Sequence, residues 1–268
     1  MNFTNTEVWG FEHALRGMRN PKNSWSKSDT VFGTLDVSKA VEFSNPNEFK
    51  NGRVGNFDGI PCYTVGQSKT KALLDYIGIG KNDMKLAQSL IRAGSEHRKF
   101  MRQIFVSVDI TAPLYWWKEF DTYKVGTVAN STSTMHKLTS QPITKDCFEI
   151  DDYNGVICDE GKFIFEVESS WVELIDTLEQ LRQTYLETKD KRVWKELIRL
   201  LPESWLQTRT VTMSYENLLA MCSKGQRRNH KLNEWSGIDD DSLANFISWA
   251  RTLPYAQEFI FIDEVNEE

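Results

Sequence analysis

The stretch that decides the fold runs from residue 99 to residue 135 and reads KFMRQIFVSVDITAPLYWWKEFDTYKVGTVANSTSTM. Between residues 106 and 111, apolar and polar side chains alternate, which is the period-2 pattern of a half-buried strand. Pro113 ends that strand, and proline can also occupy the first position of a helix. The stretch therefore predicts a strand followed at once by a helix over residues 114–124.

The predicted helix carries one apolar stripe, because Trp116, Phe120 and Tyr123 recur at helical spacing. A loop of small and polar residues, VGTVANSTSTM, follows it and offers backbone N–H and hydroxyl groups to an anion. The order of strand, helix and loop gathers side chains that can hold a phosphorylated ligand near one end of a sheet, namely Lys118, Glu119, Tyr123, Lys124, Thr127, Asn130 and Ser133. The alternative interpretation is a packed aromatic helix with a solvated polar face.

A second polar segment lies downstream, where the β-branched run QTRTVTM precedes a helix over residues 215–223. Cationic side chains cluster around it in an otherwise acidic chain: Arg209, Arg227, Arg228, His230 and Lys231. Arginine suits bidentate recognition of phosphate. The alternative is an exposed charged run beyond a helix C-terminus, where cations are favoured in any case.

The remaining elements are predicted from periodicity and caps. Helices are expected over residues 12–18, 71–80, 82–93, 171–187, 193–201 and 243–251, and short strands over 31–35, 53–54, 61–65 and 162–168. Asn82 or Asp83 is expected to cap one helix and Asp190 another. Without a regular βαβ rhythm, this pattern predicts an α+β fold with a mostly antiparallel sheet and flanking helices. We expect a single domain over residues 1–268, with residues 1–70 as a largely irregular N-terminal extension packed on it.

Composition excludes several classes of protein. The chain has 268 residues, a net charge of −6 and a pI of about 5.4, which argues against a nucleic-acid binder. There is no signal-peptide pattern and no apolar run long enough for a membrane span, so we expect a cytoplasmic protein with reduced thiols. The four histidines lie in separate segments, and the four cysteines lack metal-ligand spacing, so no metal site is predicted: Cys62, Cys147, Cys158 and Cys222.

Two blocks of residues together carry a resemblance to a known family. The first block has a Glu-His pair, a proline step and a set of spaced polar residues: Glu96-His97, Ala112-Pro113, Tyr123-Lys124, Thr127, Asn130 and Ser133. The second has a Leu-Pro step, a Thr-rich run, a leucine pair and an arginine: Leu201-Pro202, Thr210–Met213, Leu218-Leu219 and Arg227 or Arg228. This order resembles the flavin-dependent thymidylate synthases, whose signature is similar to R-H-R-x-x-S-x-N-E-x-S-x-R-Y. Residues 112–136 resemble a phage and Firmicute branch of thymidylate synthase-like proteins.

The resemblance implies a thymidylate synthase-complementing-protein-like fold and a homotetramer with FAD bound where subunits meet. It implies transfer of a methylene group from methylenetetrahydrofolate to C5 of dUMP, giving dTMP, with NADPH reducing the flavin and with no cysteine nucleophile. The cofactor would then supply the redox chemistry. Carried over to this chain, FAD would contact His97, Tyr123, Lys124 and Asn130. The nucleotide would contact Glu119, Thr127, Ser133, Arg227 and Arg228.

Several signature positions differ from the family pattern. The Arg-His-Arg triplet is replaced by Thr122, Tyr123 and Lys124, the late Arg-Tyr by Met135-His136, and an upstream Gln by Glu119. A hydrogen bond to a charged group contributes roughly 1.5–3 kcal/mol, so losing arginines can change the nucleotide preference. Two alternatives follow: a catalytically inactive oligomeric module that binds a nucleotide or flavin, or a related enzyme that hydroxymethylates a deoxypyrimidine. A third is an unrelated structural protein in which the order is fortuitous.

Overall fold

The computed structural model describes residues 1–36, 53–57, 60–65, 73–150, 156–159, 162–166, 168–225 and 228–265. The chain forms two compact units. Unit 1 comprises Met1–Asn2, Ile110–Thr122 and Asn130–Arg209, and unit 2 comprises Phe3–Asp109, Tyr123–Ala129 and Thr210–Glu268. Compact units can arise within one domain as well as between domains, so the expected single-domain organisation stays a prediction.

The strand expected from the alternating residues is present as β6 (Phe105–Pro113). Val106, Val108 and Ile110 are fully buried while the residues between them are half-buried, which confirms the period-2 pattern. The sheet that contains β6 has the order β1-β6-β10-β7, with β1 at Asn2–Trp9, β10 at Leu206–Ser214 and β7 at Val128–Ser131. The extended QTRTVTM run is thus confirmed within β10, whereas β1 was not predicted.

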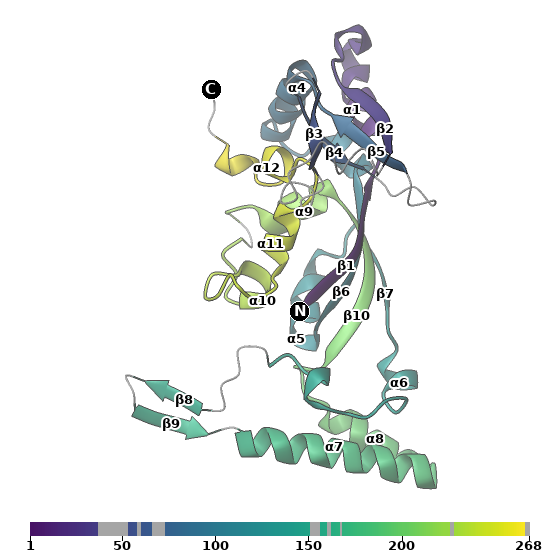
Figure 1. Cartoon of the computed structure of the whole chain (residues 1–268), viewed down its shortest axis with the longest axis vertical. Coiled ribbons are helices and arrows are strands. Elements are labelled where there is room, and N and C mark those ends of the chain that lie inside the picture. The colour runs from purple at the N-terminus through teal and green to yellow at the C-terminus, as the bar shows by residue number, and fades with distance from the viewer. Residues whose placement is uncertain are drawn as a thin grey trace. The chain divides into compact units, whose positions relative to one another are not determined.

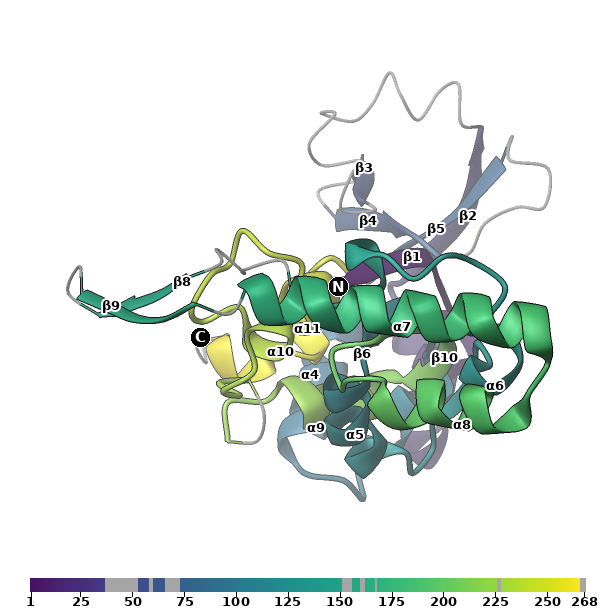
Figure 2. The same ribbon diagram turned by 90° about the horizontal axis from the view of Figure 1, so that it is seen from below.

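Unit 2 contains a second, antiparallel sheet with the order β2-β5-β4-β3, whose strands β2, β4 and β5 are seen together in Figure 2. Its strands are β2 (Val31–Asp36), β3 (Arg53–Phe57), β4 (Ile60–Thr64) and β5 (Leu73–Gly78). The helix predicted over residues 71–80 is wrong, because β5 occupies residues 73–78 and pairs with a strand on each side. Ile77, which pairs with Phe32 on one side and Tyr63 on the other, is fully buried. Burial between two strands outweighs the weak local preference for helix.

The helices of unit 2 surround an aromatic core. They are α1 (Phe11–Arg19), α4 (Lys81–Arg92), α9 (Tyr215–Cys222), α10 (Asn233–Ser236), α11 (Phe246–Arg251) and α12 (Ala256–Phe259), with 3-10 turns at Asn20–Lys22, Trp25–Lys27, Lys99–Gln103 and Ile262–Glu264. Phe11 makes edge-on contacts with Tyr215 at 5.5 Å and Tyr255 at 5.9 Å between ring centroids. The helices predicted at 12–18, 82–93 and 215–223 are confirmed. The last predicted helix begins at Phe246, three residues later than expected.

Unit 1 holds α5 (Leu114–Phe120), α6 (Thr134–Lys137), a 3-10 turn at Lys145–Cys147, the β8–β9 hairpin (Val156–Asp159 and Lys162–Glu166), α7 (Glu168–Thr188) and α8 (Lys191–Leu200). Helices α7 and α8 lie side by side (Figures 1 and 2), and Leu178 and Leu197 are fully buried in their core. Asp190 caps α8 as predicted, since its carboxylate accepts from the Arg192 N–H at 2.8 Å.

The predicted α+β fold class, with an antiparallel sheet and flanking helices, is confirmed by these elements. In the part of the chain that the structure describes, none of the helices is both long and apolar enough to cross a membrane.

Candidate functional site

The first turn of α9 is where two predicted segments of unit 2 meet. Ser214 precedes the helix and forms a capping box with Asn217: the Asn217 N–H donates to Ser214 Oγ at 3.3 Å, and the Ser214 N–H donates to Asn217 Oδ1 at 3.0 Å. A capping box of this kind fixes both the start and the direction of a helix. The side chains of Glu216 and Asn217 in this turn each contact a different distant segment.

Glu216 holds the segment that follows His97. Its carboxylate accepts from Arg98 Nε at 3.1 Å, and it also pairs with Arg102. Burial alone would raise the pKa of Glu216, but the hydrogen bonds from the two arginines outweigh burial and lower it. Glu216 is therefore ionised at neutral pH. One carboxylate faces two guanidinium groups, which leaves a cationic excess on this segment.

Asn217 holds the other segment, the loop that begins at Tyr123. Its Nδ2 donates to the Val125 carbonyl at 2.8 Å. The loop is closed by a turn in which the Thr127 N–H and Oγ1 both donate to the Lys124 carbonyl at 3.1 Å. Helix α9 thus joins the His97 segment to the Tyr123–Thr127 loop, which the sequence separates by more than twenty residues.

The predicted cofactor residues in unit 2 differ in exposure. His97 and Lys124 are exposed, and Tyr123 is half-buried with its ring centroid 6.0 Å from that of Trp235. Thr127 is half-buried, and its hydroxyl proton is engaged with the Lys124 carbonyl. A phosphate only accepts hydrogen bonds, so Thr127 would have to rotate its hydroxyl before donating to one.

Of the two predicted arginines, Arg227 lies outside the described residues, and Arg228 is buried in unit 2 with an exposed fraction of 8%. Its Nε donates to the Cys222 carbonyl at 2.8 Å, its Nη1 lies 2.8 Å from Glu264 Oε1, and its Nη2 pairs with Asp263. Two carboxylates therefore already neutralise this guanidinium. The guanidinium therefore has little uncompensated charge for a phosphate, and the predicted role of Arg228 stays a prediction.

The other predicted residues belong to unit 1. Glu119 is half-buried on α5, Asn130 is exposed on β7, and Ser133 is half-buried at the start of α6, where its carbonyl accepts from the Lys137 N–H at 3.0 Å. The neighbouring cations have carboxylate partners: Lys118 pairs with Glu203 at 2.6 Å and Arg209 with Asp121 at 3.0 Å.

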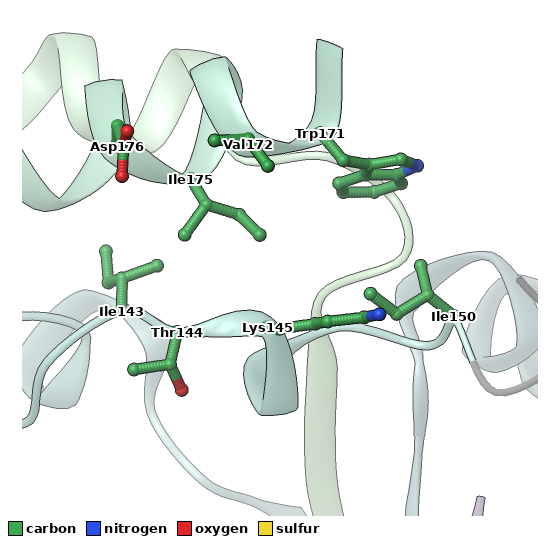
Figure 3. A pocket seen from close by; sticks show the side chains of 8 residues that line it. All are labelled: Ile143, Thr144, Lys145, Ile150, Trp171, Val172, Ile175 and Asp176. Carbon is green, nitrogen blue, oxygen red and sulfur yellow. The ribbon is translucent and has the colours of Figure 1, made fainter. Parts of the chain in front are cut away.

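Unit 1 also contains a cavity of roughly 370 Å³ (Figure 3). Trp171, Val172, Ile175 and Asp176 of α7 form one wall, and the segment from Ile143 to Ile150 forms the other, with Lys145 extended along it. Ligand pockets commonly hold about 300–1,000 Å³, so the cavity is large enough for a small molecule. None of the predicted site residues that the structure describes lines it.

Sequence reasoning missed the residues that organise the α9 site. Arg98 and Arg102 are four residues apart, and Ser214 and Asn217 have the spacing of a helix cap. Both patterns can be recognised from the sequence alone. The sequence could not predict that these residues lie together, because only the fold shows that Glu216 and Asn217 contact segments about 100 residues away.

No family model matches the chain, and no curated protein matches its sequence. Its fold is similar to that of the flavin-dependent thymidylate synthase ThyX from Helicobacter pylori, in a crystal structure complexed with FAD and dUMP. The TM-score is 0.56 at 13% identity, covering 99% of this chain and 100% of that one. A second structure of Helicobacter pylori ThyX with FAD and dUMP gives a TM-score of 0.54 at 13% identity, over 98% of each chain.

A weaker likeness, at a TM-score of 0.45 and 13% identity, is to the UMP/dUMP methylase PolB from Streptomyces cacaoi, over 88% of this chain and 95% of that one. At 13% identity the two ThyX structures establish the fold of this chain rather than its activity. The thymidylate synthase-complementing-protein-like fold implied by the sequence resemblance is thereby confirmed.

Proposed function

We propose that the chain is a flavin-dependent enzyme that transfers a one-carbon unit to C5 of a deoxyuridine nucleotide. The observation that carries the proposal is the joining of the His97 segment and the Tyr123–Thr127 loop by the first turn of α9. These are the two segments in which the family resemblance places most of the FAD contacts. The ThyX fold likeness, which spans nearly the whole chain, supports the same assignment.

The residues around α9 suit a flavin dinucleotide in charge and in side-chain type. In residues 96–102, Lys124 and Glu216 taken together, basic side chains outnumber carboxylates: Arg98, Lys99, Arg102 and Lys124 against Glu96 and Glu216. A cationic excess suits a pyrophosphate. The half-buried ring of Tyr123, braced by Trp235, offers a flat apolar surface for an isoalloxazine or adenine ring.

Each side chain has a defined task in this proposal. The Lys124 ammonium neutralises phosphate charge, the His97 imidazole donates to or accepts from the cofactor, and Tyr123 orients a ring by stacking. Asn130 completes the cofactor contacts, and Glu119, Thr127, Ser133, Arg227 and Arg228 are proposed to hold the nucleotide. When bound, FAD supplies the electrons for reducing the transferred carbon, and the chain supplies binding and orientation. Methylenetetrahydrofolate is the proposed carbon donor and NADPH the proposed reductant.

We further propose that the chain is a divergent member of the flavin-dependent thymidylate synthase family, of the phage and Firmicute type, and that it works as a homotetramer. The replacement of the signature arginines by Thr122 and Lys124 favours a second candidate, a module that binds flavin or nucleotide without turnover. Lysine is a point charge that cannot reproduce the forked contacts of arginine, so weaker or altered binding would follow.

Visible absorption of the purified protein, before and after addition of FAD, tests the proposal. We expect flavin bands near-stoichiometric with protein in the wild type. Lys124→Ala and His97→Ala should each weaken FAD binding, and the loss of a charge-assisted contact at Lys124 corresponds to about 10–100-fold in Kd. Lys85→Ala, which removes an exposed lysine on α4 of the same unit, is the matched control and should bind FAD as the wild type does.

The assay then separates the candidates. A protein that takes up FAD and forms dTMP from dUMP, methylenetetrahydrofolate and NADPH is the proposed enzyme. Uptake of FAD without turnover of any deoxypyrimidine nucleotide identifies the binding module. A colourless protein that takes up no FAD rules out the flavoenzyme.

A further inference from the structure

The turn at Lys124–Thr127 has a defined type. The Thr127 N–H donates to the Lys124 carbonyl, which closes a four-residue turn with Val125 and Gly126 at its centre. Gly126 has φ of 79°, whereas Val125 is not among the residues with positive φ. A positive φ at the third position alone is the mark of a type II turn, and glycine is favoured there because it has no Cβ.

Types I and II differ mainly in the orientation of the central peptide, here the Val125–Gly126 bond. Asn217 Nδ2 donates to the Val125 carbonyl at 2.8 Å and so fixes that peptide. In a trans peptide the C=O and the N–H point in opposite directions. Binding the carbonyl to α9 therefore turns the Gly126 N–H away from α9, and within the described residues that N–H has no acceptor.

The orientation of the Asn217 amide is itself determined by its partners. Its Oδ1 accepts from the Ser214 N–H at 3.0 Å and from Ser214 Oγ at 2.7 Å. A backbone N–H cannot accept a hydrogen bond, so the oxygen must face Ser214 and the nitrogen must face Val125. The Asn217 side chain thus takes part both in the capping box of α9 and in holding the loop.

The turn at Lys124–Thr127 is not held in place by packing of its tip. The Val125 side chain has an exposed fraction of 84% and Lys124 is also exposed, so the tip of the turn is not buried in the core. Among the described residues, the hydrogen bond from Asn217 links the central peptide of the turn to the rest of unit 2.

We propose that Asn217 is a positioning residue for the cofactor site: it selects the type II turn in which Lys124 and the Gly126 N–H face outward together toward an acceptor oxygen of the flavin cofactor. The assignment of the ligand rests on the proposed function, whereas the control of the turn by Asn217 rests on the hydrogen bonds alone. Asn217 acts through the loop and not on the reacting atoms.

The substitution Asn217→Asp removes the hydrogen bond to the loop while it keeps the helix cap. A carboxylate still accepts from Ser214 and is favourable at a helix N-terminus, so α9 keeps its cap. It cannot donate to the Val125 carbonyl, and the two oxygens repel each other. Ser214→Ala is the matched control, because it weakens the cap but leaves the Asn217 donor in place.

Limited trypsin digestion reports on the turn without any ligand, because Lys124 is exposed and the bond that follows it lies within the turn. Cleavage after Lys124 is quantified by mass spectrometry relative to cleavage after Lys191 of unit 1. We expect this relative cleavage to rise about tenfold in Asn217→Asp, because the loss of about one hydrogen bond corresponds to a tenfold change in an equilibrium constant. The Tm should be nearly unchanged. FAD affinity should fall about tenfold in the same variant. Ser214→Ala should lower Tm and leave both the cleavage rate and the affinity near wild type.

The outcomes separate this inference from the proposed function. Unchanged cleavage in Asn217→Asp overturns the control of the turn, whatever FAD does. Raised cleavage with unchanged FAD affinity overturns the link between the turn and the cofactor. Raised cleavage in a protein whose wild type binds no FAD overturns the proposed function while supporting the control of the turn by Asn217.

Discussion

Replacing Asp83 with alanine is expected to destabilise the protein by about 3–5 kcal/mol, the usual effect of removing one partner from a buried ion pair. The Asp83 side chain is fully buried, and its Oδ1 accepts from Arg19 Nε at 2.6 Å. Its Oδ2 accepts from Ser28 Oγ and Thr30 Oγ1, both at 2.6 Å, and from the N–H groups of Asp29 and Thr30. The variant would leave the Arg19 guanidinium, 4% exposed, without its counter-charge.

Urea unfolding followed by circular dichroism checks this expectation. Asp146→Ala, at an exposed aspartate of unit 1, is the control and should lie within about 0.5 kcal/mol of the wild type. A loss below about 1 kcal/mol in Asp83→Ala would contradict the buried network.

The same network predicts how stability depends on pH. Burial by itself would raise the pKa of Asp83, but the hydrogen bonds from Ser28, Thr30 and Arg19 outweigh it, so the pKa lies below its ordinary value. A carboxylate with a lower pKa in the folded state stabilises the fold fully above its unfolded pKa, about 3.9. That contribution is lost as pH falls through the folded pKa. The difference in unfolding free energy between wild type and Asp83→Asn should therefore be constant from pH 7 to pH 5 and shrink below about pH 4.

Replacing Trp117 with alanine should destabilise unit 1 by a similar amount, about 3–5 kcal/mol, because a large aromatic side chain leaves a cavity in the core. Trp117 is 1% exposed, and its Nε1 donates to the Gln207 carbonyl at 2.9 Å. The guanidinium of Arg209 lies over its ring at 4.2 Å from the centroid. The indole thus combines core packing, a hydrogen bond and a cation–π contact.

Two further variants separate the contributions of packing, the hydrogen bond and the cation–π contact to this loss of stability. Trp117→Phe keeps an aromatic ring beneath Arg209 and loses mainly the hydrogen bond, so about 1–2 kcal/mol is expected. Arg209→Ala should cost about 1 kcal/mol through the cation–π contact and the ion pair with Asp121. Denaturant midpoints measured for all three variants provide the comparison. Equal losses for the alanine and phenylalanine variants at position 117 would show that packing of the indole contributes little.

Local signals in the sequence determined much of the fold. The alternation in residues 106–111 predicted β6, helical spacing predicted α4 and α7, and Asp190 predicted the start of α8. Each of these features depends on residues within four positions of one another. Periodicity and capping are properties of neighbouring residues, so one sequence is enough to detect them.

Tertiary structure decided the features that depend on distant partners. Residues 73–78 form a central strand and not a helix, since they pair with β2 and β4. Helix α4 is not capped by Asn82 or Asp83; the carboxylate of Asp29 accepts from the N–H groups of both. That approach requires glycine at position 80, where a Cβ would lie 2.2 Å from Asp29 Cγ.

In the candidate site, too, the sequence predicted some features and the tertiary structure decided others. The sequence indicated His97, Tyr123, Lys124 and the cationic segment as the residues of interest, because their types and order are visible along the chain. It could not indicate that Glu216 and Asn217 join two of these segments, or that Arg228 is neutralised by Asp263 and Glu264. Contacts between segments tens of residues apart form only when the chain closes long loops. Local sequence patterns do not predict which of these loops close.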